Sequence, residues 1–463
     1  MPKIRFPLAA AALAASTSFA AGPPDYEASL ASSRTLLNEL VAVDTTNPPG
    51  NEERAVAIVA QQLDAGGIPY EVTDFAPGRK NIVARLAGTG GAKPLLLLAH
   101  LDVVGAENQP WTSPPHELTE RDGFLVGRGV DDDLGMAVVE LETVAMLKKS
   151  GESLRRDVIL AFTGDEESGG KGIRWLLEHR PESIDAEIAF NEGGGVRLDD
   201  AGKVSFIGLQ AAEKTYQDFI LSTKGSTGHS SVPLADNAID RIARALDRLA
   251  RNPFQIHLLP VTRAYFEARA AVEPPAMAWA LRIASRAKEP IPAKALETIQ
   301  TNPVLAATLR TTCVATLVSG GTRKNALPAG AQATVNCRIL PDETIEDVRK
   351  ALAEKVDDPA VTIELGEGSG AGPPSPLDGT APAAVKKVAG KIWPGVPVIP
   401  QFSLVATDSR FLRERGVAAY GLDPIALTEQ DARRAHGIDE RIPVSSLRPG
   451  LQFFYELVLD LAR

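Results

Sequence analysis

The chain has 463 residues, of which 44% are hydrophobic and 23% charged, enough for two or three domains with a large core. Its 49 Lys and Arg residues against 59 Asp and Glu residues give a net charge of −10 at pH 7. An acidic chain without a basic run is a poor partner for nucleic acid or for an anionic membrane surface, so both classes are excluded.

The first 20 residues have the pattern of a secretory signal peptide. Lys3 and Arg5 form a positive start, residues 6–15 are apolar, and residues 18–20 (SFA) form a small-x-small cleavage site. The apolar run is too short to span a membrane, and no second long apolar segment follows. The alternative is a buried N-terminal helix. We therefore expect an exported protein without a membrane span, periplasmic in a Gram-negative source, whose net charge changes from −10 to −12 when the two cations are removed.

The first half of the chain alternates between helical and strand patterns, which predicts an α/β fold with a mostly parallel sheet flanked by helices. The runs 94–99 and 158–163 are apolar on both faces, which is typical of central strands covered by helices on both sides. We expect helices over 26–40, 52–65, 134–149 and around 173–178, and strands over 70–75, 81–86, 94–99, 158–163 and 187–190.

The pattern changes after about residue 204. Strands are expected over 215–223, 312–318, 331–340 and 361–365, helices over 237–251 and 345–355, and an Ala- and Arg-rich helical stretch over 253–310. These elements predict an α+β unit inserted into the first domain. The expected division is a signal peptide (1–20), a catalytic domain (21–208 and 368–463) and an inserted lid or dimerisation domain (209–367). The second catalytic part includes a helix over 386–392, a strand over 417–422 and a final helix from Val444.

The two cysteines, Cys313 and Cys337, lie on strand-like segments of the inserted unit. Export permits a disulfide between them, and their spacing does not fit a metal site. The sequence leaves open whether they pair.

Polar side chains follow three of the predicted buried strands. His100 follows 94–99, Glu166 and Glu167 follow 158–163, and Glu192 follows 187–190. Ligands of parallel sheets gather beyond the carboxyl ends of the strands, so these side chains are expected to lie together. Asp102 lies two residues after His100, where its carboxylate can take one imidazole N–H while the other nitrogen binds metal.

The segment GRGVDDDLG (127–135) holds three consecutive carboxylates, Asp131 to Asp133. Such a concentration of charge in one turn is costly unless a positive group lies there. Three aspartates alone would be interpreted as a solvated loop, Glu166 and Glu167 as the start of an acidic helix, and His436 as an ordinary loop histidine. Together, in this order, they favour a metal site in which Asp132 is shared between two ions.

The sequence resembles the di-zinc amidohydrolases that include carboxypeptidase S, aminoacylase, glutamate carboxypeptidase and acetylornithine deacetylase. RTT (310–312), TDSRFL and the helical insertion are most similar to the carboxypeptidase S-like branch. The segments that carry the resemblance are AHLDVV (99–104), GRGVDDDLG, TGDEESGG (163–170), NEGGG (191–195), KGSTGHSS (224–231), RKNALP (323–328), NCRILP (336–341), TDSRFL (407–412) and AHGIDE (435–440).

The resemblance implies a zinc-exopeptidase-like catalytic domain with two Zn²⁺ ions, for which Co²⁺ or Mn²⁺ can substitute. Asp132 would bridge the ions, His100 and Glu192 would hold one, and Glu167 and His436 the other. Glu166 would be the general base, Asp102 would orient His100, and the peptide Asp132–Asp133 would be cis. Three carboxylates against two Zn²⁺ leave about one positive charge, which suits a metal-bridging hydroxide.

The resemblance also implies a homodimer through the lid domain. His229 would polarise the scissile carbonyl, often from a neighbouring subunit, and Asn325 and Arg338 would grip the substrate. Arg338 also fits a plain strand-surface arginine. The chain departs from the family at Leu134, where relatives carry Lys, and at residues 405–406 (VA), where they often carry Gly-Gly.

The function expected from these residues is that of an exported zinc metallopeptidase acting on short peptides, of the carboxypeptidase or dipeptidase type. An N-acyl amino acid amidohydrolase is the alternative with the same chemistry, because both reactions cleave an amide beside a carboxylate. A non-catalytic binding protein on the same scaffold is the alternative from another class.

Overall fold

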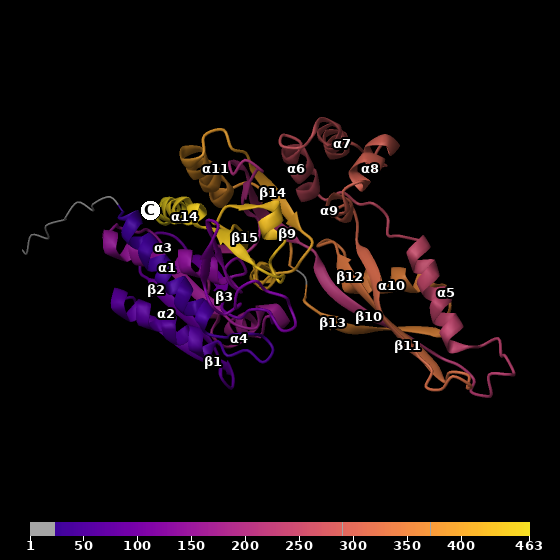
Figure 1. The fold of residues 1–463 in the computed structure, drawn as a ribbon. Coiled ribbons are helices and arrows are strands. Elements are labelled where there is room, and N and C mark those ends of the chain that lie inside the picture. Colours follow the sequence, from indigo (N-terminus) through magenta and orange to yellow (C-terminus); the bar gives the residue numbers. More distant parts are fainter. Residues whose placement is uncertain (1–23, 289, 371) are drawn as a thin grey trace, which may run out of the picture.

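The computed structural model describes residues 24–288, 290–370 and 372–463, so the predicted signal peptide lies outside the described residues. The chain forms a large sheet with helices on both faces and a separate four-stranded sheet that extends to one side (Figure 1). The α/β class predicted from the sequence is confirmed. None of the described helices is long and apolar enough to cross a membrane.

The large sheet has the order β1-β2-β6-β3-β7-β15-β9-β8-β16, with β14 beside β9. At its centre β3 pairs in parallel with β6 on one side and with β7 on the other, as the alternating pattern predicts. The strands are β1 (Tyr70–Ala76), β2 (Arg79–Leu86), β3 (Leu95–His100), β6 (Val158–Thr163), β7 (Ile188–Asn191), β8 (Gly195–Leu198), β9 (Val204–Glu213), β14 (Val398–Ser403), β15 (Ala418–Gly421) and β16 (Leu427–Thr428).

Helices cover the large sheet on both faces because its central strands are apolar on both faces. Leu95 and Leu97 of β3 belong to a core with α1, α3, α11 and α14, whereas Leu96 and Leu98 pack with α4 and α12. Each fully buried leucine contributes about 2 kcal/mol of transfer free energy. The helices of this part are α1 (Tyr26–Ala42), α2 (Glu53–Gly66), α3 (Leu134–Ser150), α4 (Lys171–His179), α11 (Thr380–Ile392), α12 (Ser409–Glu414), α13 (Glu429–Ala432) and α14 (Val444–Ala462).

A small antiparallel sheet lies beside this core in the order β17-β5-β4. It joins the segment before Gly127 to the segment after Glu440, because β17 pairs with β5. Its strands are β4 (Thr119–Arg121), β5 (Phe124–Val126) and β17 (Arg441–Pro443).

The four-stranded sheet is antiparallel, in the order β11-β12-β10-β13. One face packs on helices α5 and α10, and β11 is an edge strand with exposed apolar side chains. The elements are β10 (Thr215–Lys224), β11 (Thr312–Gly320), β12 (Gly330–Ile339), β13 (Val361–Gly368), α5 (Ala238–Arg251) and α10 (Ile345–Val356).

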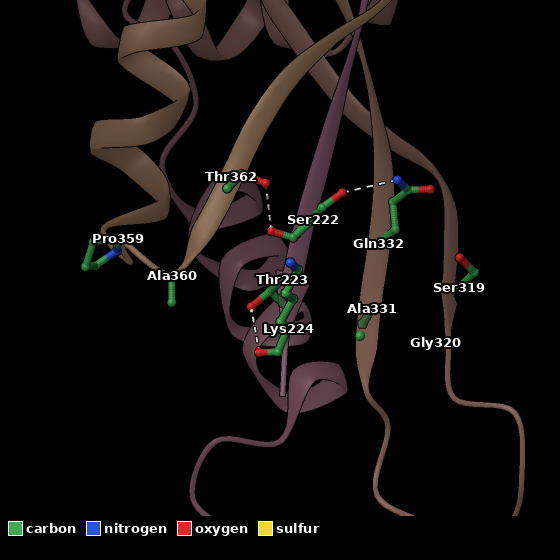
Figure 2. A pocket seen from close by; sticks show the side chains of 11 residues that line it. Ser222, Thr223, Lys224, Ser319, Gly320, Ala331, Gln332, Pro359, Ala360 and Thr362 are labelled. Atoms are coloured by element: carbon green, nitrogen blue, oxygen red, sulfur yellow. Dashed lines mark hydrogen bonds between the residues drawn. The ribbon is translucent and has the colours of Figure 1, made fainter. Parts of the chain in front are cut away.

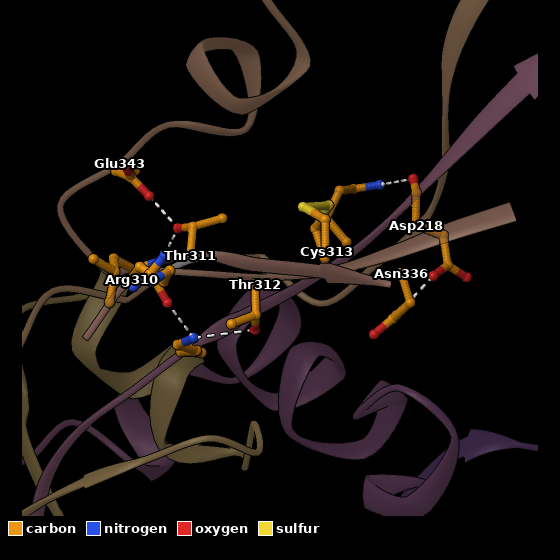
Figure 3. Close-up of a disulfide and its surroundings, with 11 residues drawn as sticks. Asp218, Arg310, Thr311, Thr312, Cys313, Asn336 and Glu343 are labelled. Carbon is orange, nitrogen blue, oxygen red and sulfur yellow. Dashed lines mark hydrogen bonds between the residues drawn. A yellow bond between two sulfur atoms is a disulfide. The ribbon is translucent and has the colours of Figure 1, made fainter. Parts of the chain in front are cut away.

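Cys313 and Cys337 are direct partners in the register of β11 and β12, and they form a disulfide (Figure 3). The pairing that the sequence left open is therefore present. It joins the edge strand to its neighbour.

The helical stretch between α5 and β11 does not lie on the four-stranded sheet. Its core includes Phe206 of β9 and Ile399 of β14, so these helices cover one end of the large sheet. They are α6 (Pro260–Arg269), α7 (Pro275–Arg286), α8 (Ala293–Gln300) and α9 (Pro303–Ala307). The domain boundaries at residues 208 and 367 remain a prediction.

Candidate metal centre

Three neighbouring parallel strands bring the predicted residues to one edge of the large sheet. β3 ends at His100, β6 runs into Glu166 and Glu167, and β7 runs into Glu192. The loop after Glu192 needs glycine, because Gly194 has φ +63° and a Cβ there would lie 2.6 Å from two carbonyl oxygens. Among the described residues, donor atoms of His100, Glu166 and Glu192 lie within 4.8 Å of one another, as do those of His100, Asp132 and Glu167.

Asp132 lies between two histidines that come from opposite ends of the chain. His100 Nε2 is 3.1 Å from Asp132 Oδ1, and His436 Nε2 is 3.1 Å from Asp132 Oδ2. The same His436 nitrogen is 3.1 Å from Glu167 Oε2. The peptide between Asp132 and Asp133 is cis, as predicted. The carboxylate therefore presents one oxygen to each side of the cluster.

Burial and mutual repulsion control the charges in this cluster. Burial raises the pKa of Glu166 well above its usual range, and Asp408 raises it further while His100 and Arg410 oppose the shift. Burial likewise raises the pKa of Glu192, with repulsion from Glu166 as the next cause. Carboxylates held this close are stabilised by a cation placed among them.

The pKa values of the two histidines are also raised, which favours their charged forms, whereas the two glutamates favour their neutral forms. Burial opposes the charged form of His100, yet its hydrogen bonds to Asp102 and Asp132 raise its pKa well above the usual value. The hydrogen bonds that His436 donates to Asp132 and Glu167 raise its pKa to about 10. In both cases the nearby carboxylates favour a positive charge at this position, which is the charge that a bound cation would supply.

The donor set fits divalent metal ions. It consists of imidazole nitrogens and carboxylate oxygens, the ligands that Zn²⁺ takes in three-protein-ligand sites and that also suit Co²⁺ and Mn²⁺. Glu167 Oε1 is buried and has no hydrogen-bond partner among the described residues, although its other oxygen contacts His436. A cation would satisfy this oxygen.

The imidazole of His100 contacts the backbone carbonyl of Asp102, whereas the sequence predicted a contact with its carboxylate. His100 Nδ1 is 2.9 Å from the carbonyl oxygen of Asp102 and 3.6 Å from its carboxylate Oδ1. The carboxylate accepts hydrogen bonds from the backbone N–H groups of Glu166 and Glu167, both at 3.2 Å, and from Asn47 Nδ2 at 2.8 Å. Asp102 thus fixes the turn that carries the two glutamates as well as the imidazole.

Three buried side chains around the cluster were not identified from the sequence, those of Thr163, Asp408 and Arg410. Arg410 Nη1 lies 4.0 Å from Glu166 Oε1, and Thr163 Oγ1 donates to Asp408 Oδ2 at 3.1 Å. Burial raises the pKa of Asp408 to about 6. The signal that could have indicated these residues is TDSRFL, since Asp408 and Arg410 lie in a motif already matched to the family.

A cavity of about 460 Å³ opens beside the cluster and extends to the four-stranded sheet. Glu166, Glu167 and His436 line one side, and Tyr216 and Arg338 line the other. The Arg338 guanidinium lies 4.8 Å from the centre of the Tyr216 ring. Val405 and Ala406, where relatives often carry two glycines, also line the cavity.

His229 and Asn325 do not line this cavity in the single chain. They lie at the far end of the four-stranded sheet, where the Ser230 N–H donates to the Asn325 carbonyl at 3.1 Å and His229 pairs with Ala326. The His229 side chain is exposed. The structure therefore places Arg338 at the cavity beside the cluster and leaves His229 and Asn325 outside that cavity.

A further hollow of about 650 Å³ lies at the end of the four-stranded sheet, between residues such as Ser222, Gln332 and Thr362 (Figure 2). Its lining residues include no His, Cys, Asp or Glu. It therefore offers no set of metal ligands, and Lys224 is the one ionisable side chain in its lining.

The profile of peptidase family M20/M25/M40 matches residues 96–460. The chain belongs to this family. As an M20-family protein it is a metallopeptidase or amidohydrolase, a hydrolase that acts on amide bonds, and the family depends on a dinuclear metal centre.

Relatives within the family have different substrates. The chain is 31% identical to human N-fatty-acyl-amino acid synthase/hydrolase PM20D1, over 79% of this chain and 74% of that protein. It is 29% identical to the probable carboxypeptidase S-like 2 of Dictyostelium discoideum (79% and 71%) and 24% identical to human aminoacylase-1 (92% and 95%).

Solved structures of the family share the fold. The M20 family metallo-carboxypeptidase Sso-CP2 from Sulfolobus solfataricus superposes with a TM-score of 0.71 at 19% identity, covering 93% of this chain and 99% of that one. A dinuclear metal binding peptidase from Bacillus subtilis gives a TM-score of 0.61 at 14% identity, covering 94% and 99%.

Proposed function

We propose that this chain is an exported zinc-dependent peptidase that hydrolyses short peptides with a free terminal carboxylate. The observation that carries the proposal is the position of Asp132, with one carboxylate oxygen facing His100 and the other facing His436, each at 3.1 Å. In this assignment His100 and Glu192 hold one ion, and Glu167 and His436 hold the other. Bound divalent ions would lower the pKa of a water molecule and polarise the scissile carbonyl.

The chain's own residues supply the proton transfers and the orientation of the substrate. Glu166 lies at the edge of the cavity and takes the proton from the water that attacks the amide carbon, then delivers it to the leaving nitrogen. Arg410 lies 4.0 Å from Glu166 and supports its charged form. Arg338 faces the same cavity, where its planar guanidinium matches the fork of a carboxylate.

Export is proposed from the pattern of residues 1–20. The disulfide between Cys313 and Cys337 supports this, because disulfides persist in oxidising compartments and are rare in the cytosol.

A homodimer completes the proposed site. His229 and Asn325 lie outside the cavity of their own chain, and we assign them to the substrate of a partner subunit. The edge strand β11 supports an interface on the four-stranded sheet, because Val314, Leu317 and Val318 are all more than 60% exposed there. Unpaired strand edges with apolar side chains pair readily with another chain.

A second candidate function is the hydrolysis of N-acyl amino acids, which the 31% identity to the human N-fatty-acyl-amino acid synthase/hydrolase favours. Both substrates present an amide next to a free carboxylate.

One experiment tests the proposal: hydrolysis of dipeptides, N-acetyl amino acids and long-chain N-acyl amino acids by the zinc-loaded protein, with and without a chelator. Chelator-sensitive cleavage of dipeptides supports the first candidate, and cleavage of N-acyl substrates alone supports the second. Cleavage of neither class would contradict both.

A further inference from the structure

The loop that carries His436 differs from the other segments of the metal centre. The His100 side chain is 2% exposed at the end of β3, whereas the His436 side chain is 55% exposed. His436 also has a φ of 62°, in the left-handed region that few residues with side chains adopt. Packing around the ring therefore does not hold His436 in place, and its position depends on contacts made by its neighbours.

Those contacts come from a buried ion pair, Arg128 and Glu440, whose side chains are each 1% exposed. Arg128 Nη1 donates to Glu440 Oε2 at 2.6 Å. The other oxygen, Glu440 Oε1, accepts from the backbone N–H groups of Asp131 at 2.9 Å and Asp132 at 3.1 Å. One carboxylate thus holds both the arginine and the backbone of the central aspartate.

Arg128 reaches the histidine loop with its second terminal nitrogen. Nη2 donates to the carbonyl of Gly437 at 3.1 Å and to Gln109 Oε1 at 3.2 Å, and the guanidinium lies 5.0 Å from the Trp111 ring centre. The Gly127 N–H donates to the Glu440 carbonyl at 3.1 Å. Hydrogen bonds at both ends of the pair therefore join the loop of residues 127–132 to the loop of residues 436–440.

We propose that Arg128 and Glu440 are positioning residues that fix His436 relative to Asp132, and that they thereby control one of the two metal ions. This inference rests on the proposed function, in which Asp132, Glu167 and His436 share that ion. The other ion would be held by His100 and Glu192, which the ends of β3 and β7 position without this pair. Because Asp132 faces both ions, loss of the pair should weaken the ion at His436 more than the ion at His100 and Glu192.

The physical reason is that a buried charge needs its partner. Removing one member leaves the other desolvated and unpaired, so the surrounding loops rearrange. Mutation of a residue that holds a metal ligand in place typically lowers metal affinity about 10- to 100-fold.

The experiment is a titration of the metal-free full chain with Co²⁺, following the d–d absorption and the number of ions bound. Glu440→Gln keeps the shape and an oxygen for the two N–H groups but loses the charge. Arg128→Met/Glu440→Gln removes both charges and leaves no unpaired ion, so it remains informative if the single variant folds poorly. Glu273→Gln is the control, because Glu273 pairs with Arg269 at 2.6 Å on the helical stretch outside the metal centre.

We expect the wild type and Glu273→Gln to bind two ions. Glu440→Gln and the double variant should bind one ion with an affinity close to that of the wild type and the other about 10- to 100-fold more weakly, with a changed d–d spectrum. If both variants bound both Co²⁺ ions with wild-type affinity, or lost affinity for both ions equally, the inference would be overturned while the proposed function remained intact. A wild type that binds fewer than two ions would overturn the proposed function itself, and the inference with it.

Discussion

Glu213 and Lys214 are consecutive residues whose side chains are anchored in different parts of the molecule. Glu213, the last residue of β9, accepts a hydrogen bond from Thr407 Oγ1 at 3.0 Å and pairs with the buried Arg413 at 2.6 Å. Lys214 donates to the carbonyl of Arg310 at 2.6 Å and to Thr312 Oγ1 at 3.2 Å. Figure 3 shows Arg310 and Thr312, which accept these hydrogen bonds, in the surroundings of the disulfide. Glu213 and Lys214 therefore anchor the connection between β9 of the large sheet and β10 of the four-stranded sheet.

Lys214 should make stability depend on pH. Burial lowers its pKa to about 7, with Arg338 and Arg310 adding to the shift and Glu343 opposing it. Between about pH 7 and the ordinary value of 10.5 the unfolded chain binds a proton that the folded chain has released, so the folded state gains stability as pH rises.

The measurement is chemical unfolding of the wild type and of Lys214→Met across this pH range. The free energy of unfolding of the wild type, relative to Lys214→Met, should rise by up to about 1.4 kcal/mol per pH unit. Lys386→Met, on an exposed lysine, is the control. A wild-type advantage that stays constant from pH 7 to 10.5 would show that the folded lysine keeps its proton.

The disulfide should contribute to stability. Cys313 and Cys337 are 24 residues apart, and closing a loop of this size is worth roughly 3 kcal/mol on the chain-entropy account. We expect Cys313→Ala/Cys337→Ala to lower the free energy of unfolding by about 2–4 kcal/mol. Reductant should destabilise the wild type and leave the double variant unchanged; equal responses of the two proteins would mean that the cysteines are not paired in solution.

Arg338 should recognise the free carboxylate of the substrate. A lost hydrogen bond between charged groups costs about 1.5–3 kcal/mol, so Arg338→Ala should lower kcat/KM about 10- to 100-fold for a substrate with a free carboxylate. For the same substrate with its carboxylate converted to an amide, kcat/KM should change little. Arg338→Lys should have a kcat/KM between those of the wild type and Arg338→Ala, because lysine keeps the charge but lacks the planar fork of the guanidinium. Arg349→Ala, on the exposed face of α10, is the control. Equal losses for acid and amide would remove Arg338 from this role.

His229 should act across the dimer. Glu166→Ala is expected to be inactive while keeping its metal ions, and His229→Ala to be strongly impaired. In a random mixture of the two, half of the dimers are mixed and each mixed dimer has one complete site, which predicts about a quarter of wild-type activity. If each His229 served its own subunit, the mixture would remain as inactive as its components.

Much of the fold could be predicted because the central strands are short, apolar and bounded by polar ends. The strand expected over 158–163 is β6 (Val158–Thr163), and its end carries Glu166 and Glu167 to the cluster. By contrast β14 (Val398–Ser403) was not predicted, because Pro400 and Gln401 interrupt the strand pattern. Helix α11 begins at Thr380 instead of the expected 386, since Pro382 lies in the first turn, where proline is tolerated.

The supporting contacts of the site could not be predicted, for a different reason. Glu440 holds the backbone of Asp132 across 308 residues of sequence, and no local pattern encodes that distance. The position of His229 outside the cavity of its own chain likewise depends on how the four-stranded sheet is oriented relative to the large sheet. Residue types and their order indicate which ligands converge, whereas the parts that hold them become visible only in three dimensions.

The number of divalent ions bound per chain shows whether Asp132 lies between two metal ions. Purified protein would be incubated with Zn²⁺, freed of excess metal and analysed by mass spectrometry for zinc, alongside Asp132→Ala. We expect two ions in the wild type and at most one in the variant, with hydrolysis lost. Two tightly bound ions in folded Asp132→Ala, or fewer than two in the wild type, would contradict the proposed metal centre.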